Sequence, residues 1–160
     1  MTNTKPTTLS RAKTVSDQLT DDRILEIFAK SKGSKGTQLL GFSLIESNIA
    51  AGTVKATFML DDRFENPMGS VQGGFLVAAL DEVMTVAVIV KSGLTILAPS
   101  LEIKANYIKS VKPGLVEAEG RVVRLGKSVA FLEGTLFNDK GEPAVTATAT
   151  CLVRPRPQNK

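Results

Sequence analysis

The sequence predicts an α+β fold in which one antiparallel sheet curls around a single long helix. Residues 73–91 are nearly all apolar and too long to be one strand. The chain beyond residue 93 consists of alternating runs rich in β-branched residues, separated by turns that contain Gly or Pro. The 160 residues, of which 42% are hydrophobic, hold no linker between regions of different composition, which fits one domain.

We expect that domain to cover residues 19–155, with a mobile N-terminal tail at 1–18 and a C-terminal tail at 156–160. The N-terminal tail is rich in Thr and lacks apolar periodicity. Residues 20–32 predict a short amphipathic helix, because Thr20 and an acidic residue precede apolar residues at helical spacing.

Two strands are expected next, at 39–47 and 52–60, followed by a loop rich in Asp, Asn, Pro and Gly before the long helix. Four further strands follow the helix. The turns between these four are short, so we expect antiparallel neighbours arranged as a meander. Their predicted ranges are 100–111, 115–126, 128–139 and 144–155.

The long helix carries two adjacent carboxylates in an apolar surrounding. Within 75–90 only Asp81, Glu82 and Thr85 are polar. A helix of this length could span a bilayer, but a carboxylate pair near its centre is costly in lipid. The sequence therefore predicts a helix buried against a sheet, and no membrane partner.

The composition excludes several chemistries. The chain has no His, which removes nucleophile systems that need an imidazole, and its single Cys cannot form a thiolate metal cluster. We therefore expect no metal and no cofactor. The net charge is +4 without clusters of Lys and Arg interleaved with aromatic residues, so no nucleic-acid partner is expected. The single Cys and the lack of a secretory signal favour a cytoplasmic location.

The stretch "NPMGSVQGGFLVAALDEVM" (66–84) resembles the signature of hotdog-fold acyl-CoA thioesterases of the phenylacetate-degradation type. Asn66, Gly73, Gly74 and Asp81 are in register with that signature. The similarity continues through "KPG" and "RVVRLGKSVAF" and covers about residues 36–153. It implies a hotdog fold, which is the sheet-around-helix arrangement predicted above.

A thioester hydrolase must stabilise a tetrahedral oxyanion and activate a nucleophile. A helix that begins at Gly73 presents unpaired N–H groups and its positive dipole end there, so Gly73 is the candidate oxyanion donor. Asp81 is the candidate nucleophile or general base. Its neighbour Glu82 points about a quarter-turn away around the helix, so the two carboxylates are not expected to face the same small site. Gln72 replaces the His that most family members carry, and it can still form hydrogen bonds.

The remaining candidates come from the resemblance. Asn66 and Ser100 resemble residues that orient the loop and the catalytic carboxylate or its water. A turn at 124–128 resembles one that contacts the nucleotide end of CoA, where basic groups and Gly N–H groups suit phosphate. The predicted substrate-binding residues are Gln72, Gly74, Thr85, Arg124, Gly126, Lys127 and Ser128.

The spacing of the candidates predicts an oligomer. Asp81 lies eight residues beyond Gly73, which is about 12 Å along a helix. One helix cannot bring both groups to one carbonyl, whereas two antiparallel copies can. The resemblance implies the same interface, so we expect a homodimer as the minimal unit and a homotetramer as the assembly.

The sequence thus predicts hydrolysis of acyl-CoA or aroyl-CoA thioesters, with an acyl-CoA as partner and an acyl group that the sequence does not specify. The alternative is a hotdog domain that binds acyl-CoA without hydrolysing it. A hydratase or dehydratase is rejected, because those enzymes pair a carboxylate with a His.

Overall fold

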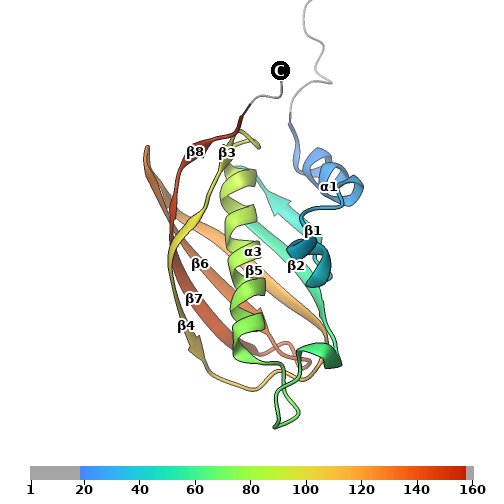
Figure 1. The fold of residues 1–160 in the computed structure, drawn as a ribbon. Coiled ribbons are helices and arrows are strands. Elements are labelled where there is room, and N and C mark those ends of the chain that lie inside the picture. The colour runs from blue at the N-terminus through green and yellow to red at the C-terminus, as the bar shows by residue number, and fades with distance from the viewer. Residues whose placement is uncertain (1–18, 158–160) are drawn as a thin grey trace, which may run out of the picture.

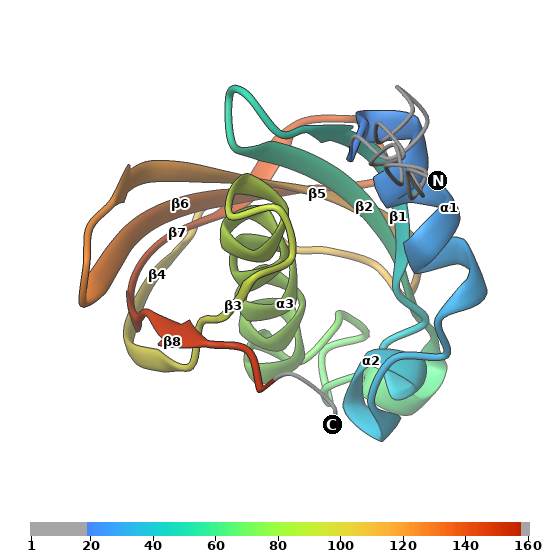
Figure 2. The same cartoon turned by 90° about the horizontal axis from the view of Figure 1, so that it is seen from above.

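A six-stranded antiparallel sheet wraps around the helix α3 (Gly73–Lys91) in the computed structural model, which describes residues 19–157 (Figures 1 and 2). The predicted tail at 1–18 and the end of the predicted C-terminal tail, 158–160, lie outside the described residues. The sheet covers one side of α3, and the N-terminal helices lie beyond the edge formed by β1 (Ser43–Asn48) (Figure 2).

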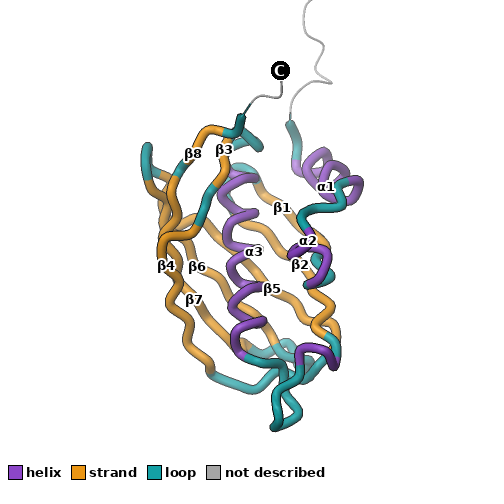
Figure 3. Tube along the Cα trace, in the orientation of Figure 1, coloured by secondary structure: helices purple, strands orange, loops and turns teal. Residues whose placement is uncertain are grey.

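The predicted fold is confirmed, with a long central helix, a short N-terminal helix and one main sheet. Figure 3 distinguishes the helices from the strands along the chain. The elements other than α3 are α1 (Asp21–Lys30), α2 (Lys35–Leu39), β1 (Ser43–Asn48), β2 (Thr53–Leu60), a 3₁₀ turn (Asp62–Phe64), β3 (Ile96–Leu97), β4 (Ser100–Tyr107), β5 (Gly114–Leu125), β6 (Val129–Phe137), β7 (Pro143–Leu152) and β8 (Arg154–Pro155).

Helix α1 forms where its capping residues predict it. The hydroxyl of Thr20 accepts a hydrogen bond from the backbone N–H of Arg23 at 3.2 Å, so it satisfies one of the unpaired donors of the first turn. Asp21 ties the helix to the sheet, because its Oδ1 accepts hydrogen bonds from the Ser47 hydroxyl and from the backbone N–H of Ile49. Helix α1 therefore covers β1, the strand at one edge of the sheet.

The strand predicted at 39–47 begins too early. Leu39 ends helix α2, and β1 starts only at Ser43. Ser34 caps α2 by accepting a hydrogen bond from the N–H of Thr37, and Gly41 then takes a positive φ of 60° between the helix and the strand. The side chain of Leu40 is buried by this helical turn, so apolar residues that resemble a strand in sequence here belong to a helix end.

The predicted meander is correct for β5, β6 and β7 and wrong for β4. The strand order is β1-β2-β5-β6-β7-β4, so β4 pairs with β7 at the far edge, and β2 pairs with β5. The short segment after Tyr107 crosses below the N-terminus of α3 instead of forming a hairpin. There the carbonyl of Val111 accepts a hydrogen bond from the N–H of Val71. The short connection from β4 to β5 therefore does not make these two strands neighbours in the sheet.

Helix α3 approaches the sheet closely because two glycines face it. Gly120 of β5 and Gly134 of β6 are directly paired across the strands. A Cβ at Gly120 would lie 2.5 Å from the carbonyl oxygen of Val83, and one at Gly134 would lie 2.9 Å from the Met84 side chain. The helix therefore packs partly on backbone, and nine of its residues are buried.

By length and composition alone α3 could cross a membrane. It lies lengthwise in the curve of the sheet and supplies the middle of the hydrophobic core (Figures 1 and 2). The same apolar character is what a central core helix requires.

A second, two-stranded sheet was not predicted. The strand β3 follows α3 and pairs with β8 near the C-terminal end of the described chain. The backbone N–H of Arg156 also bonds to the carbonyl of Thr95. These contacts hold the segment that leads from the end of α3 into β4.

Candidate active site

Asp81 and Ser100 meet between the helix and the edge strand. The Ser100 hydroxyl donates a hydrogen bond of 2.5 Å to Oδ1 of Asp81. Asp81 is half-buried in the middle of α3, and Ser100 opens β4. The register with β7 shifts between Ser100 and Glu102, and irregularities of this kind can re-aim a side chain. A charge-assisted bond of this length fixes the orientation of the carboxylate.

The sulfur of Cys151 is the next atom in the same cluster. Cys151 of β7 is fully buried and stands opposite Ser100 in the strand register, with Sγ 3.6 Å from the Ser100 Oγ. Burial raises the pKa of the Cys151 thiol, the hydrogen bond with Ser100 opposes this, and the nearby Asp81 charge raises the pKa further. A buried, protonated thiol therefore lies behind the serine.

Glu82 faces a different element. Its Oε1 accepts a hydrogen bond of 2.9 Å from the hydroxyl of Thr37 in α2. Burial raises the pKa of Glu82, the Thr37 bond opposes this, and the charge of Asp81 adds to the rise. The two neighbouring carboxylates thus bind to different elements, as the quarter-turn between them around the helix predicts.

Thr85 lies one turn beyond Asp81 but does not cap its carboxylate. Its hydroxyl donates to the backbone carbonyls of Asp81 and Glu82 at 2.8 and 3.0 Å. Such hydrogen bonds to carbonyls of the preceding turn satisfy the hydroxyl within the helix. The carboxylate of Asp81 is therefore held by Ser100 and not by its own helix.

The start of α3 forms a second cluster, around Gly73. The Tyr107 hydroxyl, at the end of β4, donates a hydrogen bond of 3.0 Å to the carbonyl of Gly73. A Cβ at Gly73 would lie 2.9 Å from the Tyr107 ring, so the ring needs a glycine there. A Cβ at Gly74 would meet nothing within 4 Å, so that side is open. Gln72 is the exposed N-cap residue, and its side chain makes no capping hydrogen bond.

Asn66 organises the loop that leads to this helix end. Its Oδ1 accepts hydrogen bonds from the N–H groups of Met68 and Ser70, and its backbone N–H donates to the Ser70 carbonyl at 2.7 Å. The loop is tied back where the N–H of Gln72 bonds to the carbonyl of Phe64. Asn66 therefore shapes the approach to Gly73, and its side-chain oxygen is occupied within the loop.

The turn at 124–128 joins β5 to β6, and strand register places it at the Ser100 end of the sheet. Leu125 pairs with Ala130, which stands beside Cys151 and so beside Ser100. The N–H of Gly126 bonds across the turn to Val129, and the carbonyl of Ser128 accepts from Val153. Arg124 and Lys127 are exposed there.

Within one protomer the predicted site residues therefore lie in two separate groups. Asp81 and Ser100 lie at one level, with the 124–128 turn near the same end of the sheet. Gly73 and Tyr107 lie at the other end of β4. Seven strand steps separate Ser100 from Tyr107, which is about 23 Å. The candidate carboxylate and the candidate oxyanion donor do not converge within one protomer.

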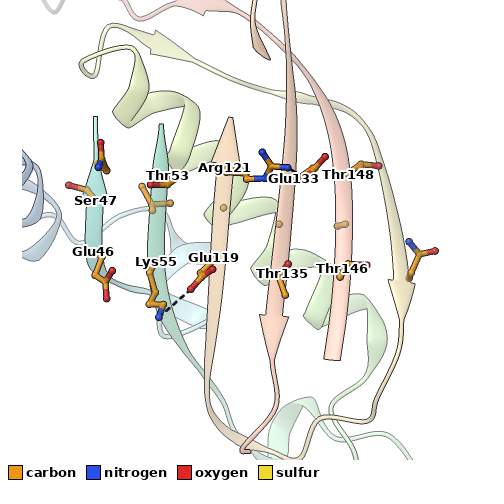
Figure 4. Close-up of a pocket in the computed structure, with 16 residues that line it drawn as sticks. Glu46, Ser47, Thr53, Lys55, Glu119, Arg121, Glu133, Thr135, Thr146 and Thr148 are labelled. Atoms are coloured by element: carbon orange, nitrogen blue, oxygen red, sulfur yellow. Dashed lines mark hydrogen bonds and ion pairs between the residues drawn. The ribbon is translucent and has the colours of Figure 1, made fainter. Parts of the chain in front are cut away.

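A cavity lies elsewhere, on the outer face of the sheet (Figure 4). Its volume is about 680 Å³, and polar side chains of several strands line it. Lys55 lies 3.2 Å from Glu119, and Arg121 forms an ion pair with Glu133 (Figure 4). None of the predicted site residues line it, and its cations already have carboxylate partners, so it does not suit a polyanionic ligand.

Sequence reasoning missed two residues of these clusters. These are Cys151 and Tyr107, neither of which was among the predicted site residues. No local motif marks either of them, because both reach their partners through strand pairing over long sequence distances. The alternation of the strands indicated which side chains point inward, but the order of the strands was needed to place them beside Asp81 and Gly73.

Comparison with known proteins agrees with the fold. Residues 68–145 match the family model described as Thioesterase superfamily. The crystal structure of a phenylacetic acid degradation-related protein from Ralstonia eutropha superposes with a TM-score of 0.75 and 30% sequence identity, over 82% of this chain and 98% of that chain. The chain belongs to the hotdog-fold thioesterase family. As a hotdog thioesterase it is a thioester hydrolase.

Two curated hotdog relatives have narrower names. The 1,4-dihydroxy-2-naphthoyl-CoA hydrolase of Escherichia coli is 26% identical over 116 residues, covering 72% of this chain and 85% of that protein. The proofreading thioesterase EntH of Klebsiella pneumoniae is 25% identical over 126 residues, covering 78% and 90%. Both similarities run across most of the hotdog domain.

Proposed function

We propose that this hotdog thioesterase hydrolyses acyl-CoA or aroyl-CoA thioesters to the free acid and CoA, with Asp81 as the catalytic carboxylate. The observation that carries the proposal is the 2.5 Å hydrogen bond between Ser100 and Asp81, which orients a half-buried carboxylate on the central helix. The similarity to a naphthoyl-CoA hydrolase supports CoA as the leaving group. A carboxylate and backbone dipoles can carry out this chemistry without an imidazole.

The reaction needs one oxygen to add to the thioester carbon and the carbon–sulfur bond to break. Asp81 either removes a proton from water as the water adds, or adds itself and forms an anhydride that water then cleaves. In both routes the CoA thiolate leaves and takes up a proton. Ser100 keeps one Asp81 oxygen occupied, so the other oxygen is the reactive one.

The oxyanion is assigned to the N–H of Gly73 at the start of α3. A helix N-terminus offers unpaired N–H groups and a positive dipole end, which favour a developing negative charge. The open space beside Gly74 lets a carbonyl oxygen approach the backbone closely. Gln72 borders the same opening and can hydrogen-bond to the substrate.

The site is shared across a homodimer in this proposal. The strand β4 is the uncovered edge of the main sheet within residues 19–157, whereas α1 covers the opposite edge (Figure 1). Antiparallel pairing of two β4 strands about a two-fold axis would place the Ser100 end of one strand opposite the Tyr107 end of the other. Asp81 of one copy would then approach Gly73 of its partner. Exposed apolar residues along this edge, Leu101, Tyr107 and Ile108, would be covered.

The nucleotide end of CoA is assigned to the 124–128 turn. Arg124 and Lys127 are exposed, and neither makes an ion pair in the described part of the chain. Two unpaired cations provide a complementary surface for phosphate oxygens, whereas the N–H of Gly126 is already used within the turn. Replacing both with Ala should raise KM for CoA thioesters while leaving kcat near the wild-type value.

The first test is turnover of benzoyl-CoA and octanoyl-CoA by wild type, Asp81→Asn and Glu82→Gln, measured as free acid by chromatography. Loss of the carboxylate should lower kcat by about 10²-fold to 10⁴-fold in Asp81→Asn. Glu82→Gln is the matched control and should retain activity. A fully active Asp81→Asn variant would contradict the assignment.

The same panel decides between hydrolysis and binding without turnover. If the wild type binds the CoA thioesters but releases no acid from any of them, the protein is an acyl-CoA-binding hotdog domain. Single-turnover reaction in ¹⁸O-labelled water tests for the anhydride route. Unlabelled oxygen in the first product, with label incorporated into Asp81, identifies an anhydride that water cleaves at the Asp81 carbonyl. Labelled oxygen in the first product fits the general-base route or cleavage of an anhydride at its acyl carbonyl.

A further inference from the structure

The buried thiol behind Ser100 has a defined place in the hydrogen-bond geometry of the site. Ser100 Oγ lies between two acceptor-capable groups, at 2.5 Å from Asp81 Oδ1 and 3.6 Å from Cys151 Sγ. An ionised carboxylate can only accept, so the single hydroxyl proton of Ser100 points to Asp81. Between Ser100 and Cys151 the remaining proton is that of the thiol, so the S–H donates to the Ser100 oxygen.

We propose that Cys151 is a positioning residue for the thioesterase reaction, which holds the Ser100 hydroxyl toward Asp81 by donating its S–H to Ser100 Oγ. The inference rests on the function proposed above. Its effect on chemistry would pass through Ser100, because Cys151 itself is fully buried and has no access to the substrate.

The surroundings of the thiol favour this role. Cys151 is fixed between its neighbours Ser100 and Ala130, and the N–H of Leu152 bonds to the carbonyl of Pro99, so both partner backbones are held in place. Burial keeps the thiol protonated and therefore able to donate. Ser100, in contrast, is exposed at the start of an edge strand. Without a donor behind it, its hydroxyl could turn to solvent in another staggered rotamer.

The test compares Cys151→Ala and Cys151→Ser, each in the wild-type and the Ser100→Ala backgrounds. Loss of a weak S–H donor should lower kcat by about threefold to tenfold in Cys151→Ala, with KM unchanged. Cys151→Ser restores a donor and should stay close to wild type. In the Ser100→Ala background, Cys151→Ala should cause no further loss, because the residue through which it acts is gone.

Packing effects are separated by a control on the same strand. Val145 is as buried as Cys151 and lies at the opposite end of β7. Val145→Ala should lower the melting temperature and leave kcat unchanged. The proposal is overturned if Cys151→Ala retains full kcat, if it lowers kcat equally with and without Ser100, or if Cys151→Ser fails as badly as Cys151→Ala while remaining folded.

An infrared measurement tests the same hydrogen bond without an activity assay and without substituting Cys151. The chain has one Cys, so its S–H stretching band belongs to Cys151 alone. The band should move to higher frequency in Ser100→Ala, because the thiol loses its acceptor; an unchanged band would contradict the proposal. An active Asp81→Asn variant overturns the proposed function, whereas inactive Asp81→Asn with fully active Cys151→Ala overturns only the role of Cys151.

Discussion

At the scale of single residues, two adjacent glycines at the start of α3 have different reasons to be glycine. Gly73 lacks a Cβ because the Tyr107 ring occupies the space, and Gly74 faces open space. The chain has one Tyr and no Trp, so its intrinsic fluorescence comes from Tyr107.

Gly73→Ala should displace the Tyr107 ring and break its hydrogen bond to the Gly73 carbonyl. We expect acrylamide to quench the tyrosine emission more strongly in this variant than in wild type. Gly74→Ala is the matched control, because it adds the same methyl group one residue later without a contact. It should leave the emission unchanged and stabilise the helix by up to about 1 kcal/mol. Equal quenching in both variants would contradict the packing described here.

At the scale of elements, Glu82 couples the stability of the α2–α3 contact to pH. Its folded-state pKa is raised above the ordinary value of 4.5, mainly by burial. A raised carboxyl pKa means that the folded protein binds the proton more tightly than the unfolded chain does. Stability is therefore lost as pH rises from about the ordinary value through the raised folded value.

Glu82→Gln should remove this loss, since its amide oxygen can still accept from Thr37. We expect its melting temperature to exceed that of wild type at pH 7, with the difference closing near pH 4. Glu46→Gln, on the exposed side of β1, is the same substitution at a surface position and serves for comparison. A Glu82→Gln variant that melts below wild type at pH 7 would show that its charge stabilises the contact.

The contact between α3 and the sheet gives a second prediction at this scale. A methyl group at Gly120 would press on the backbone at Val83, whereas one at Gly134 would meet the ends of Met84 and Leu80. Backbone cannot move aside as a Met side chain can. Chemical unfolding should therefore show a loss of about 3 kcal/mol or more for Gly120→Ala and about 1 kcal/mol for Gly134→Ala. The reverse order would mean that the helix shifts easily.

These elements also mark how far the sequence could predict the structure. The long apolar run of residues 73–91, the Thr20 cap and the alternation of β5, β6 and β7 are local signals, and they placed those elements correctly. The position of β4 beside β7 depends on which backbone groups remain unpaired after the other strands assemble. No residue in β4 encodes that choice locally. For the same reason the sequence could name Asp81 and Ser100 but could not place Cys151 behind them.

At the scale of the whole molecule, the proposed shared site predicts that two inactive chains can complement each other. A dimer of one Asp81→Asn chain and one Gly73→Ala chain would contain one site with both groups intact. If both parents are inactive, random mixing should restore about a quarter of the wild-type rate, because half of the dimers are mixed and each has one good site. No recovery after refolding a mixture would indicate that each site lies within one chain.

The assembly itself can be tested at the open edge of the sheet. Leu101 on β4 and Leu115 on β5 are similarly exposed, at 57% and 60%. Leu101→Lys should dissociate the dimer in sedimentation experiments and lower activity with it, because it places a charge in the proposed interface. Leu115→Lys should keep the dimer active. A stable, active monomer in either case would contradict the shared site.

The glycine pair under α3 also limits how such a chain can vary. Because the helix backbone at Val83 lies against Gly120, the strand has no room for a side chain at that position. Glu119 and Arg121, the neighbours on the outer face, have no such restriction. In a library randomised across 119–121, functional clones should retain Gly at the middle position and accept many residues at the other two. In variants of this chain, substrate preference would then change through residues on the uncovered face of α3 and in the surrounding loops. The contact between α3 and the sheet would stay the same.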